Sequence, residues 1–288
     1  MSMKRILLTG ANGFVGNYFL KKYSSSYEII TFSFLNDNFA NLDLTNIDVV
    51  IHCSALVHQM KGASWEQYEK INIDQTIQLA DKAKKSGVKH FIFLSTIKVY
   101  GEESNKCYYE NSRTNPNDYY SVSKLKAEDS IRNIESTNFK ISILRCPLIY
   151  GLGVKANFAN LINLIKKVPI LPLKNIKNKR SLVFVGNVCF MLHRIIFLEK
   201  RGIFLSVDDN ALSTTELIQM LAKYLDKKIL LIDIIFFDKF LKIFKPSYYQ
   251  RLFGSLIINN DYTMKKLKLE KNKYSTAYGI REIFELNI

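Results

Sequence analysis

A turn rich in glycine separates a short apolar run from a helix-like segment close to the N-terminus. The apolar run covers residues 5–9, the glycines are Gly10, Gly13 and Gly16, and the helical pattern covers residues 14–23. Glycine permits the tight turn and lets backbone N–H groups approach a pyrophosphate at the positive end of the helix. This feature predicts a parallel α/β sheet that opens with a dinucleotide-binding unit.

Strand-like and helix-like patterns alternate through the first half of the chain. Further buried strands are expected over residues 28–32, 48–52, 90–95 and 140–144, with helices over about 71–83 and 118–134. Only residues 34–47 separate the second strand from the third, which is too short for a full crossover helix with its loops. Strands that alternate with helices predict a doubly wound parallel sheet.

The regular alternation of strand-like and helix-like patterns ends after Gly151. Two prolines open a basic connector over residues 169–180, and Ser213 with Glu216 predicts a capped helix that ends at Leu225. We expect a dinucleotide-binding domain over residues 1–150, to which 181–210 return, and a smaller α+β lobe over 151–180 and 211–288.

Charge and apolar runs limit the classes of partner. The 41 lysines and arginines against 26 aspartates and glutamates give a formal net charge of +15, which favours nucleic acid, anionic lipid or phosphorylated metabolites. The basic residues are scattered over both halves without a recognition element, so no nucleic-acid binding is expected. The longest later apolar stretch, residues 229–237, contains Asp233 and falls short of the roughly 20 residues of a membrane span.

The compartment and metal content follow from the cysteines and the first residues. The four cysteines lie far apart and have neither metal-site nor disulfide spacing; they are Cys53, Cys107, Cys146 and Cys189. The first apolar run is too short for a signal peptide. We expect a cytoplasmic protein that has no membrane span and no metal site.

Tyr120 and Lys124 form a candidate acid/base pair. Residues four apart lie on one face of a helix, so the Lys124 ammonium is expected near the Tyr120 phenol. A nearby cation stabilises the phenolate and brings a group with a pKa of about 10 into a useful range. Tyr119 precedes Ser123 by four residues, and a serine offers no charge.

The strand that begins near Phe91 ends in two hydroxyl residues, Ser95 and Thr96. Doubly wound sheets bind their ligands at the carboxyl ends of the strands. One or both hydroxyls are therefore expected to meet a substrate beside Tyr120.

Together these motifs make the chain resemble the extended short-chain dehydrogenase/reductase family, also described as NAD-dependent epimerases/dehydratases, in its nucleotide-sugar branch. The likeness covers most of the length, and it includes the glycine turn, Asp43-Leu44, His52-Cys-Ser-Ala55, Asn72, Ser95-Thr96, Tyr120 with Lys124, Arg145-Cys-Pro-Leu-Ile-Tyr-Gly151, and the stretches 153–158, 180–185 and 251–256. UDP-N-acetylquinovosamine dehydrogenases and UDP-sugar 4-epimerases are similar members.

The resemblance implies a Rossmann sheet, NAD(H) or NADP(H), a UDP-sugar substrate held by the smaller lobe, and a homodimer. Thr96 would hydrogen-bond the reacting sugar oxygen, Tyr120 would be the general acid/base, and Lys124 would tune it and contact the nicotinamide ribose. Cofactor-binding positions would be Gly10, Gly13, Phe14, Val15, Gly16, Ser33, Asp43, Leu44, Ala55, Lys124 and Pro147. Substrate-binding positions would be Ser95, Asn157, Arg180 and Arg251.

Two departures from the family pattern narrow the expected reaction. Dehydratases of the family carry an Asp-Glu pair after the active-site threonine, and Ile97 and Lys98 stand there in this chain, so dehydration is rejected. The second strand ends at Ser33 without the acidic residue that binds the ribose 2′-hydroxyl of NAD. This absence favours an enzyme that exchanges NAD(P)H over one that retains NAD.

These observations predict an NAD(P)-dependent enzyme that acts at C4 of a UDP-linked sugar. The first expectation is reduction of a UDP-4-keto-6-deoxy-N-acetylhexosamine in surface-polysaccharide synthesis. The alternative is a UDP-glucose or UDP-N-acetylhexosamine 4-epimerase. A non-catalytic dinucleotide-sensing protein is the alternative of another class, although such proteins tend to lack the Tyr/Lys pair.

Overall fold

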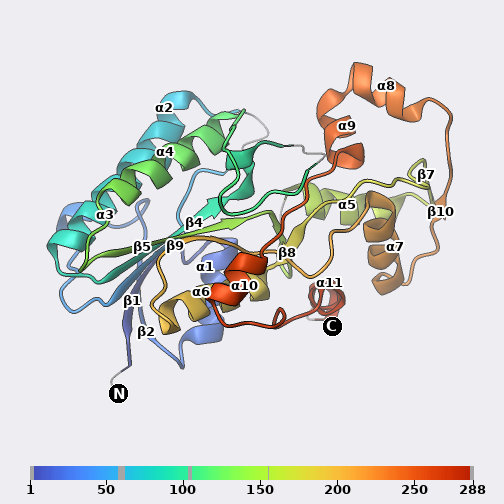
Figure 1. Ribbon diagram of the computed structural model, residues 1–288. Coiled ribbons are helices and arrows are strands. Elements are labelled where there is room, and N and C mark those ends of the chain that lie inside the picture. Colours follow the sequence, from blue (N-terminus) through green and yellow to red (C-terminus); the bar gives the residue numbers. More distant parts are fainter. Residues whose placement is uncertain (1–2, 58–61, 103–105, 155, 286–288) are drawn as a thin grey trace.

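The structure is a computed structural model that describes residues 3–57, 62–102, 106–154 and 156–285 (Figure 1). A six-stranded sheet in the order β2-β1-β3-β4-β5-β9 forms its centre, and every neighbouring pair is parallel. The strands are β1 (Arg5–Thr9), β2 (Glu28–Phe32), β3 (Val49–His52), β4 (His90–Thr96), β5 (Lys140–Cys146) and β9 (Gly202–Leu205).

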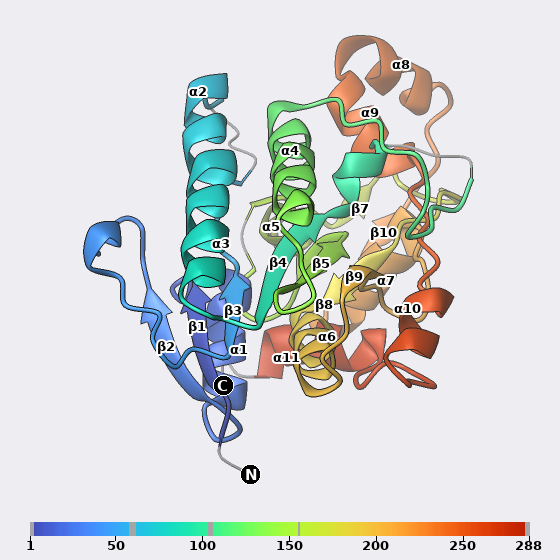
Figure 2. The ribbon, with the colours of Figure 1, turned by 60° about the vertical axis from the view of Figure 1, so that its left-hand side comes forward.

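Helices cover both faces of this sheet. On one face α1 (Phe14–Tyr23) packs against α6 (Val185–Phe197), and on the other α3 (Gln75–Lys85) lies beside α4 (Tyr119–Asn133), as Figure 2 shows. Successive residues of the central strands alternate between the two cores: Ile6 and Leu8 join the α1/α6 core, whereas Leu7 joins the α3/α4 core. The predicted doubly wound α/β fold is confirmed.

The connection between β2 and β3 is short. It contains one 3₁₀ turn, η1 (Phe39–Asn41), and no crossover helix, as the 34–47 spacing predicts. The side chains of Phe32, Phe34 and Phe39 pack against one another, with ring centroids 5.1–6.1 Å apart. Aromatic packing therefore closes the edge of the sheet where a longer crossover would lie.

The helix expected over residues 71–83 is longer than predicted and contains a π-helical stretch. It runs through α2 (Trp65–Tyr68), the π-helical η2 (Glu69–Asp74) and α3. Ser64 and Gln67 form a capping box at its start. A π-helical turn shifts the side chains that follow it, and such turns are frequent at functional sites.

The rest of the chain packs against one end and one edge of the sheet (Figure 1). Two short parallel pairs, β6 (Leu148–Tyr150) with β8 (Leu182–Phe184) and β7 (Ile170–Leu171) with β10 (Leu230–Leu231), lie among helices. The helices and the 3₁₀ turn are η3 (Ile97–Tyr100), α5 (Ala156–Lys167), α7 (Thr214–Tyr224), α8 (Phe237–Phe244), α9 (Pro246–Phe253), α10 (Asp261–Lys266) and α11 (Thr276–Glu285). The predicted smaller α+β lobe is confirmed, whereas the exact domain boundaries stay a prediction.

The predicted cap of the helix that begins after Ser213 is confirmed. The Ser213 hydroxyl accepts from Glu216 N, and the Glu216 carboxylate accepts from Ser213 N. Within the described ranges, no helix is both long enough and apolar enough to cross a bilayer.

Candidate active site

The glycine turn follows β1 at the carboxyl end of the sheet. Gly10 has a φ of 71°, and a Cβ there would lie 2.8 Å from the backbone of Cys53 and Ser54. A Cβ at Gly16 would lie 2.2 Å from Gly10 O. Gly10 is therefore required for its positive φ and its close contact with the segment after β3. Gly16 is required because α1 approaches the turn too closely for a side chain.

The N-terminus of α1 is suited to an anion. Its N-cap residue, Gly13, provides no side-chain cap, so the N–H groups of Phe14 and Val15 have no acceptor within the helix. The first turn contains no acidic residue. Free N–H groups, the helix dipole and the absence of side chains at the turn fit a dinucleotide pyrophosphate.

Thr96 ends β4 and caps the 3₁₀ turn that follows. Its hydroxyl accepts from Lys98 N at 3.3 Å, and its side chain is buried. Ile97 is also buried, and Lys98 forms ion pairs with Glu102 and Asp118. The two positions after Thr96 therefore supply no carboxylate of the kind that dehydratases carry there.

Tyr120 and Lys124 lie in the first turns of α4, which begins at the Asp118 cap. Lys124 is almost completely buried, and its ammonium lies 3.7 Å from the ring centroid of Phe93. Burial lowers the pKa of Lys124 to about 7, and Glu128 partly opposes this shift.

The phenol of Tyr120 has a pKa raised by burial and, to a lesser extent, by Asp118. The lowering expected from Lys124 is not found, because every contribution to this shift raises the pKa. Partial burial of Tyr120 and nearly complete burial of Lys124 favour the neutral form of each group.

Ser95 and Thr96 are successive residues of a strand, so their side chains point to opposite faces. The Ser95 hydroxyl donates to the buried Glu128 carboxylate, which forms an ion pair of 2.5 Å with Arg145. Arg145 also donates to the Tyr100 hydroxyl at 2.7 Å. Ser95 thus contributes to a buried polar network beneath α4, and its assignment to the substrate stays a prediction.

A chain of hydrogen bonds leads from β1 to the helix that precedes α3. Thr9 Oγ1 lies 2.7 Å from His52 Nδ1, and His52 Nε2 lies 3.0 Å from Thr76 Oγ1. Thr76 donates to Asn72 O, so the network assigns the proton of His52 to Nε2. Burial lowers the pKa of His52 to about 3, which keeps the ring neutral.

Asn72 continues this chain to α4. Its amide nitrogen donates to Ser123 Oγ at 2.9 Å, and Ser123 donates to the Tyr120 carbonyl at 2.8 Å. The same amide group pairs with the backbone N–H and C=O of Leu56. Asn72 therefore holds the segment after β3 against the helix turn that carries Tyr120.

The end of β2 has an acidic side chain that the sequence analysis missed. The chain folds back after Ser33, and the Asp37 carboxylate accepts from Ser33 N at 2.8 Å. Asp43 is exposed and accepts from the N–H and hydroxyl of Thr45, which lower its pKa. Leu44 is buried in the α3/α4 core.

The remaining predicted cofactor and substrate positions are more dispersed. Ala55 is half-buried after β3, and Pro147 is buried between β5 and β6. Arg180 donates to the carbonyls of Gln250 and Gly254 at the end of α9, and Arg251 is exposed on α9. Asn157 belongs to the first turn of α5, and its side chain lies outside the described part of the chain. The roles of all these residues stay predictions.

Two unpredicted residues had signals in the sequence. Glu128 continues the spacing of four that joins Tyr120 to Lys124, which places it on the same helix face. Asp37 lies between Asn36 and Asn38, residue types that favour a chain reversal.

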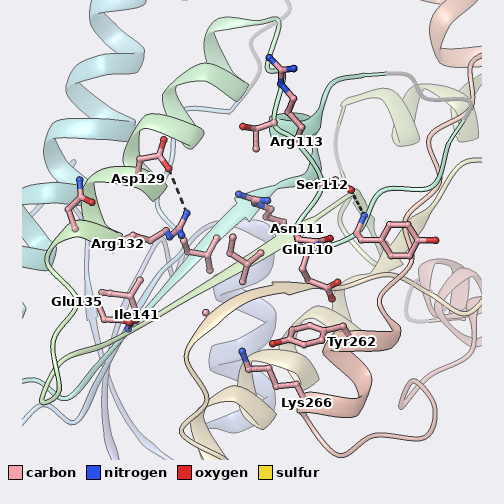
Figure 3. A pocket seen from close by; sticks show the side chains of 17 residues that line it. Glu110, Asn111, Ser112, Arg113, Asp129, Arg132, Glu135, Ile141, Tyr262 and Lys266 are labelled. Atoms are coloured by element: carbon pink, nitrogen blue, oxygen red, sulfur yellow. Dashed lines mark hydrogen bonds and ion pairs between the residues drawn. The ribbon is translucent and has the colours of Figure 1, made fainter.

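A large hollow lies elsewhere, at the far end of α4 (Figure 3). Its volume is about 1230 Å³, and its lining includes Asp129, Arg132, Ile143, Tyr262 and Lys266. Neither Thr96 nor Tyr120 lines it. The hollow lies along the sheet edge beyond α4. Its volume is therefore no guide to the position of the candidate active site.

The sequence is similar to a protein-family model and to several known proteins. Residues 6–203 match the model of the NAD dependent epimerase/dehydratase family. The chain is 35% identical to a UDP-glucose 4-epimerase of Vibrio cholerae, over 92% of this chain and 90% of the relative. It is 28% identical to an N-acetyl-alpha-D-glucosaminyl-diphospho-ditrans,octacis-undecaprenol 4-epimerase of Escherichia coli O157:H7, over 78% and 73%.

Solved structures agree in fold. A UDP-glucuronic acid 4-epimerase from Bacillus cereus, in complex with NAD, matches with a TM-score of 0.79 at 20% identity, over 98% of this chain and 97% of that one. A UDP-N-acetylglucosamine 4-epimerase from Methanobrevibacter ruminantium M1 matches with a TM-score of 0.81 at 16% identity, over 99% and 98%.

Proposed function

This chain belongs to the NAD-dependent epimerase/dehydratase family, and from that premise we propose that it inverts the configuration at C4 of a UDP-linked hexose. The observation that carries the proposal is the 35% identity to a UDP-glucose 4-epimerase across nine tenths of both chains. The glycine turn, Tyr120 and Lys124 would supply the groups that the reaction needs.

Three side chains would act on the sugar. With its own proton passed to the Lys124 amine, Tyr120 as the phenolate would take the proton of the C4 hydroxyl and return it. Thr96 would orient the C4 oxygen, and the Lys124 ammonium would stabilise the phenolate. NAD, when bound at the turn before α1, would accept and return the hydride of C4.

The loop after β2 favours NAD over NADP. Asp37 places a carboxylate at the strand end where the adenosine ribose of dinucleotides binds. A carboxylate accepts a hydrogen bond from a 2′-hydroxyl and repels a 2′-phosphate. The sequence argument for an exchangeable NAD(P)H rested on the absence of an acidic group at the end of the second strand. Asp37 supplies such a group, so the argument against an epimerase that retains NAD is weaker.

The reductase that the sequence analysis put first stays a prediction. Reduction of a UDP-4-keto-6-deoxy-N-acetylhexosamine would use the same three side chains. The two reactions differ in whether the reducing equivalents come from outside the enzyme in each turnover.

The experiment offers purified protein UDP-glucose, UDP-galactose and their N-acetylated forms without added nucleotide cofactor. The C4 configuration of the product is read from the proton couplings in NMR spectra. We expect interconversion of at least one pair. Absence of interconversion, together with oxidation of NADH or NADPH by a UDP-4-keto-6-deoxy sugar, would establish the reductase instead.

A further inference from the structure

An exposed apolar surface surrounds α8, outside the candidate active site. We call it the α8 surface, and its members are Ile234, Ile235, Phe236, Phe240, Ile243, Phe244 and Tyr248. All are exposed, from 47% for Ile234 to 80% for Ile235. No residue of α8 or α9 is fully buried. Exposed apolar residues are usually scattered singly, so a contiguous group in one segment calls for a partner.

The α8 helix has two apolar faces with different environments. Phe237 and Leu241, four residues apart, are partly buried, and Phe237 packs against Phe253 of α9. Phe240 and Phe244 form the other stripe, with ring centroids 4.9 Å apart and more than half of each side chain exposed. The inner face packs toward α9, so the outer stripe is available for another surface.

The residue before α8 is held in an unfavourable conformation. Phe236 has a φ of 64° and a ψ of 9°, the left-handed region that bulky residues rarely adopt. Its ring is 64% exposed, so packing within the described chain does not explain the conformation. Phe236 therefore combines a strained backbone with an aromatic side chain on the outside of the molecule.

Lysines border the apolar stripe. Lys239, Lys242 and Lys245 are exposed, and Asp238 is the one acidic residue of α8. Among the described residues no carboxylate forms an ion pair with these lysines; the Lys239 ammonium lies 4.9 Å from the Phe236 ring centroid. An apolar stripe with a cationic border is the pattern of helices that lie in the interface of an anionic bilayer.

We propose that the α8 surface docks the protein onto an anionic lipid membrane. The helix lies at the periphery in both ribbon views, with no element beyond it, so it is able to reach a flat surface (Figures 1 and 2). A twofold contact between two copies is less suitable because it brings the same three lysines of each copy together. Eight residues are too few to span a bilayer, so the helix lies in the interface.

Docking would leave the sheet and its cofactor turn in water. The anchor between α8 and the rest of the lobe is α9, whose terminal carbonyls of Gln250 and Gly254 accept from Arg180. The surface and the predicted UDP-binding arginines therefore belong to the same part of the fold. A docked chain would hold its substrate lobe at the membrane.

The test measures co-sedimentation of the full chain with vesicles of phosphatidylcholine alone or mixed with phosphatidylglycerol. We expect binding to the anionic vesicles that weakens as salt is raised. Phe244→Ser should lower the partition coefficient by about tenfold. Phe197→Ser is the matched control, because Phe197 on α6 is also 64% exposed and should leave binding unchanged.

A charge variant separates the two contributions. Lys239→Ala with Lys242→Ala should reduce binding to anionic vesicles, whereas Lys166→Ala with Lys167→Ala at the end of α5 should not. An equal loss of vesicle binding in the two double variants would mean that only the net charge of the protein matters, and it would overturn the proposal. So would equal binding by the Phe244 and Phe197 variants, or a wild-type dimer that Phe244→Ser dissociates without any change in vesicle binding.

Discussion

Tyr120 lies one residue from a second tyrosine, which provides an internal control for its proposed role. The Tyr119 side chain is 57% exposed, whereas Tyr120 is half-buried. Tyr120→Phe removes the proton carrier, so kcat should fall by about 10³-fold while bound NAD is retained. Tyr119→Phe should leave kcat within a factor of about two, since no proton transfer is assigned to it. Equal rates in the two variants, measured under saturating UDP-sugar, would remove Tyr120 from the mechanism.

Lys124 makes the stability of the ligand-free protein depend on pH. Its pKa is about 7 in the folded chain against 10.5 for an ordinary lysine. Between these values the unfolded chain holds the extra proton, so the Lys124 contribution to the free energy of unfolding becomes more favourable as pH rises. Below pH 7 the ammonium is buried in charged form and destabilises the fold fully.

Lys124→Met removes this buried charge. The variant should gain about 2 kcal/mol at pH 6, and the gain should shrink as pH approaches 10. Urea titrations at several pH values measure it. Lys126→Met, at an exposed position of the same helix, should give a difference from wild type that does not vary with pH. If the difference in the free energy of unfolding between Lys124→Met and wild type did not change with pH, the low pKa of Lys124 would be contradicted.

Asp37 is expected to determine which dinucleotide the protein binds. Wild type should bind NAD about tenfold or more tightly than NADP, because the proposed site would place the carboxylate near the ribose 2′-position. Asp37→Asn should narrow this ratio to about threefold by removing the repulsion. Asp43→Asn, at the exposed Thr45 turn, should preserve the preference. Calorimetric titration with both dinucleotides tests the assignment, and an unchanged ratio in Asp37→Asn would reject it.

Sequence spacing was sufficient to place Tyr120 and Lys124 on one face of a helix, and the structure places both at its start. It was insufficient for their protonation, because the pKa of each group depends on burial by residues distant in the chain, such as Phe93. Asp37 was missed for a similar reason. The Asp37 carboxylate lies five residues past the end of β2 and reaches Ser33 N only because the loop folds back.

At the scale of elements, the glycine turn depends on contact between its two ends. A Cβ at Gly16 would meet Gly10 O at 2.2 Å, so Gly16→Ala must move α1 away from the turn. We expect NAD affinity to fall by at least about 100-fold and the free energy of unfolding to fall by about 2 kcal/mol. Fluorescence titration and urea unfolding report the two effects.

Gly87→Ala is the control for that variant. Gly87 has a φ of 80° with nothing within 4 Å of an added Cβ, and it lies in the turn before β4. Its replacement should cost about 1 kcal/mol of stability through backbone strain and leave NAD affinity unchanged. Equal NAD affinity in both variants would mean that the α1 turn does not hold the pyrophosphate.

The bounds of β1, β2 and α1 match the sequence prediction because periodicity and glycine placement are local signals. The π-helical stretch η2 was not predictable in this way. It turns Asn72 inward to the backbone of Leu56 and to Ser123, which lie 16 and 51 residues away in the chain. Tertiary contacts of this kind leave no period in the sequence.

At the scale of the molecule, one buried carboxylate joins segments from four parts of the chain. Asp208 follows β9 and accepts from Tyr150 Oη at 2.5 Å, from Phe184 N at 3.0 Å and from Asn187 Nδ2 at 2.8 Å. Asn187 also pairs with the backbone of Tyr274, just before α11. No sequence motif predicts this connection, because its members are dispersed over more than 120 residues.

The charge of Asp208 is not needed for this connection. Burial raises its pKa, and the hydrogen bonds that it accepts only partly oppose the shift. Asp208→Asn keeps an oxygen for Phe184 N and Asn187, and its new amide group can donate to the Tyr150 oxygen, whose own proton then turns to the Thr276 carbonyl at 3.3 Å. Asp208→Ala removes the acceptor of Phe184 N and one of the two acceptors of the Asn187 amide group, and leaves Tyr150 only the longer bond to the Thr276 carbonyl.

The two variants should therefore change the free energy of unfolding in opposite directions. At pH 8 Asp208→Asn should raise the free energy of unfolding by about 1 kcal/mol, and Asp208→Ala should lower it by about 3 kcal/mol. As pH falls, Asp208 in the wild type gains a proton in the fold before it would in the unfolded chain, so the advantage of Asp208→Asn should disappear. Urea unfolding at pH 8 and pH 5 measures both effects. Equal damage by asparagine and alanine would show that the carboxylate must be charged to hold these segments together.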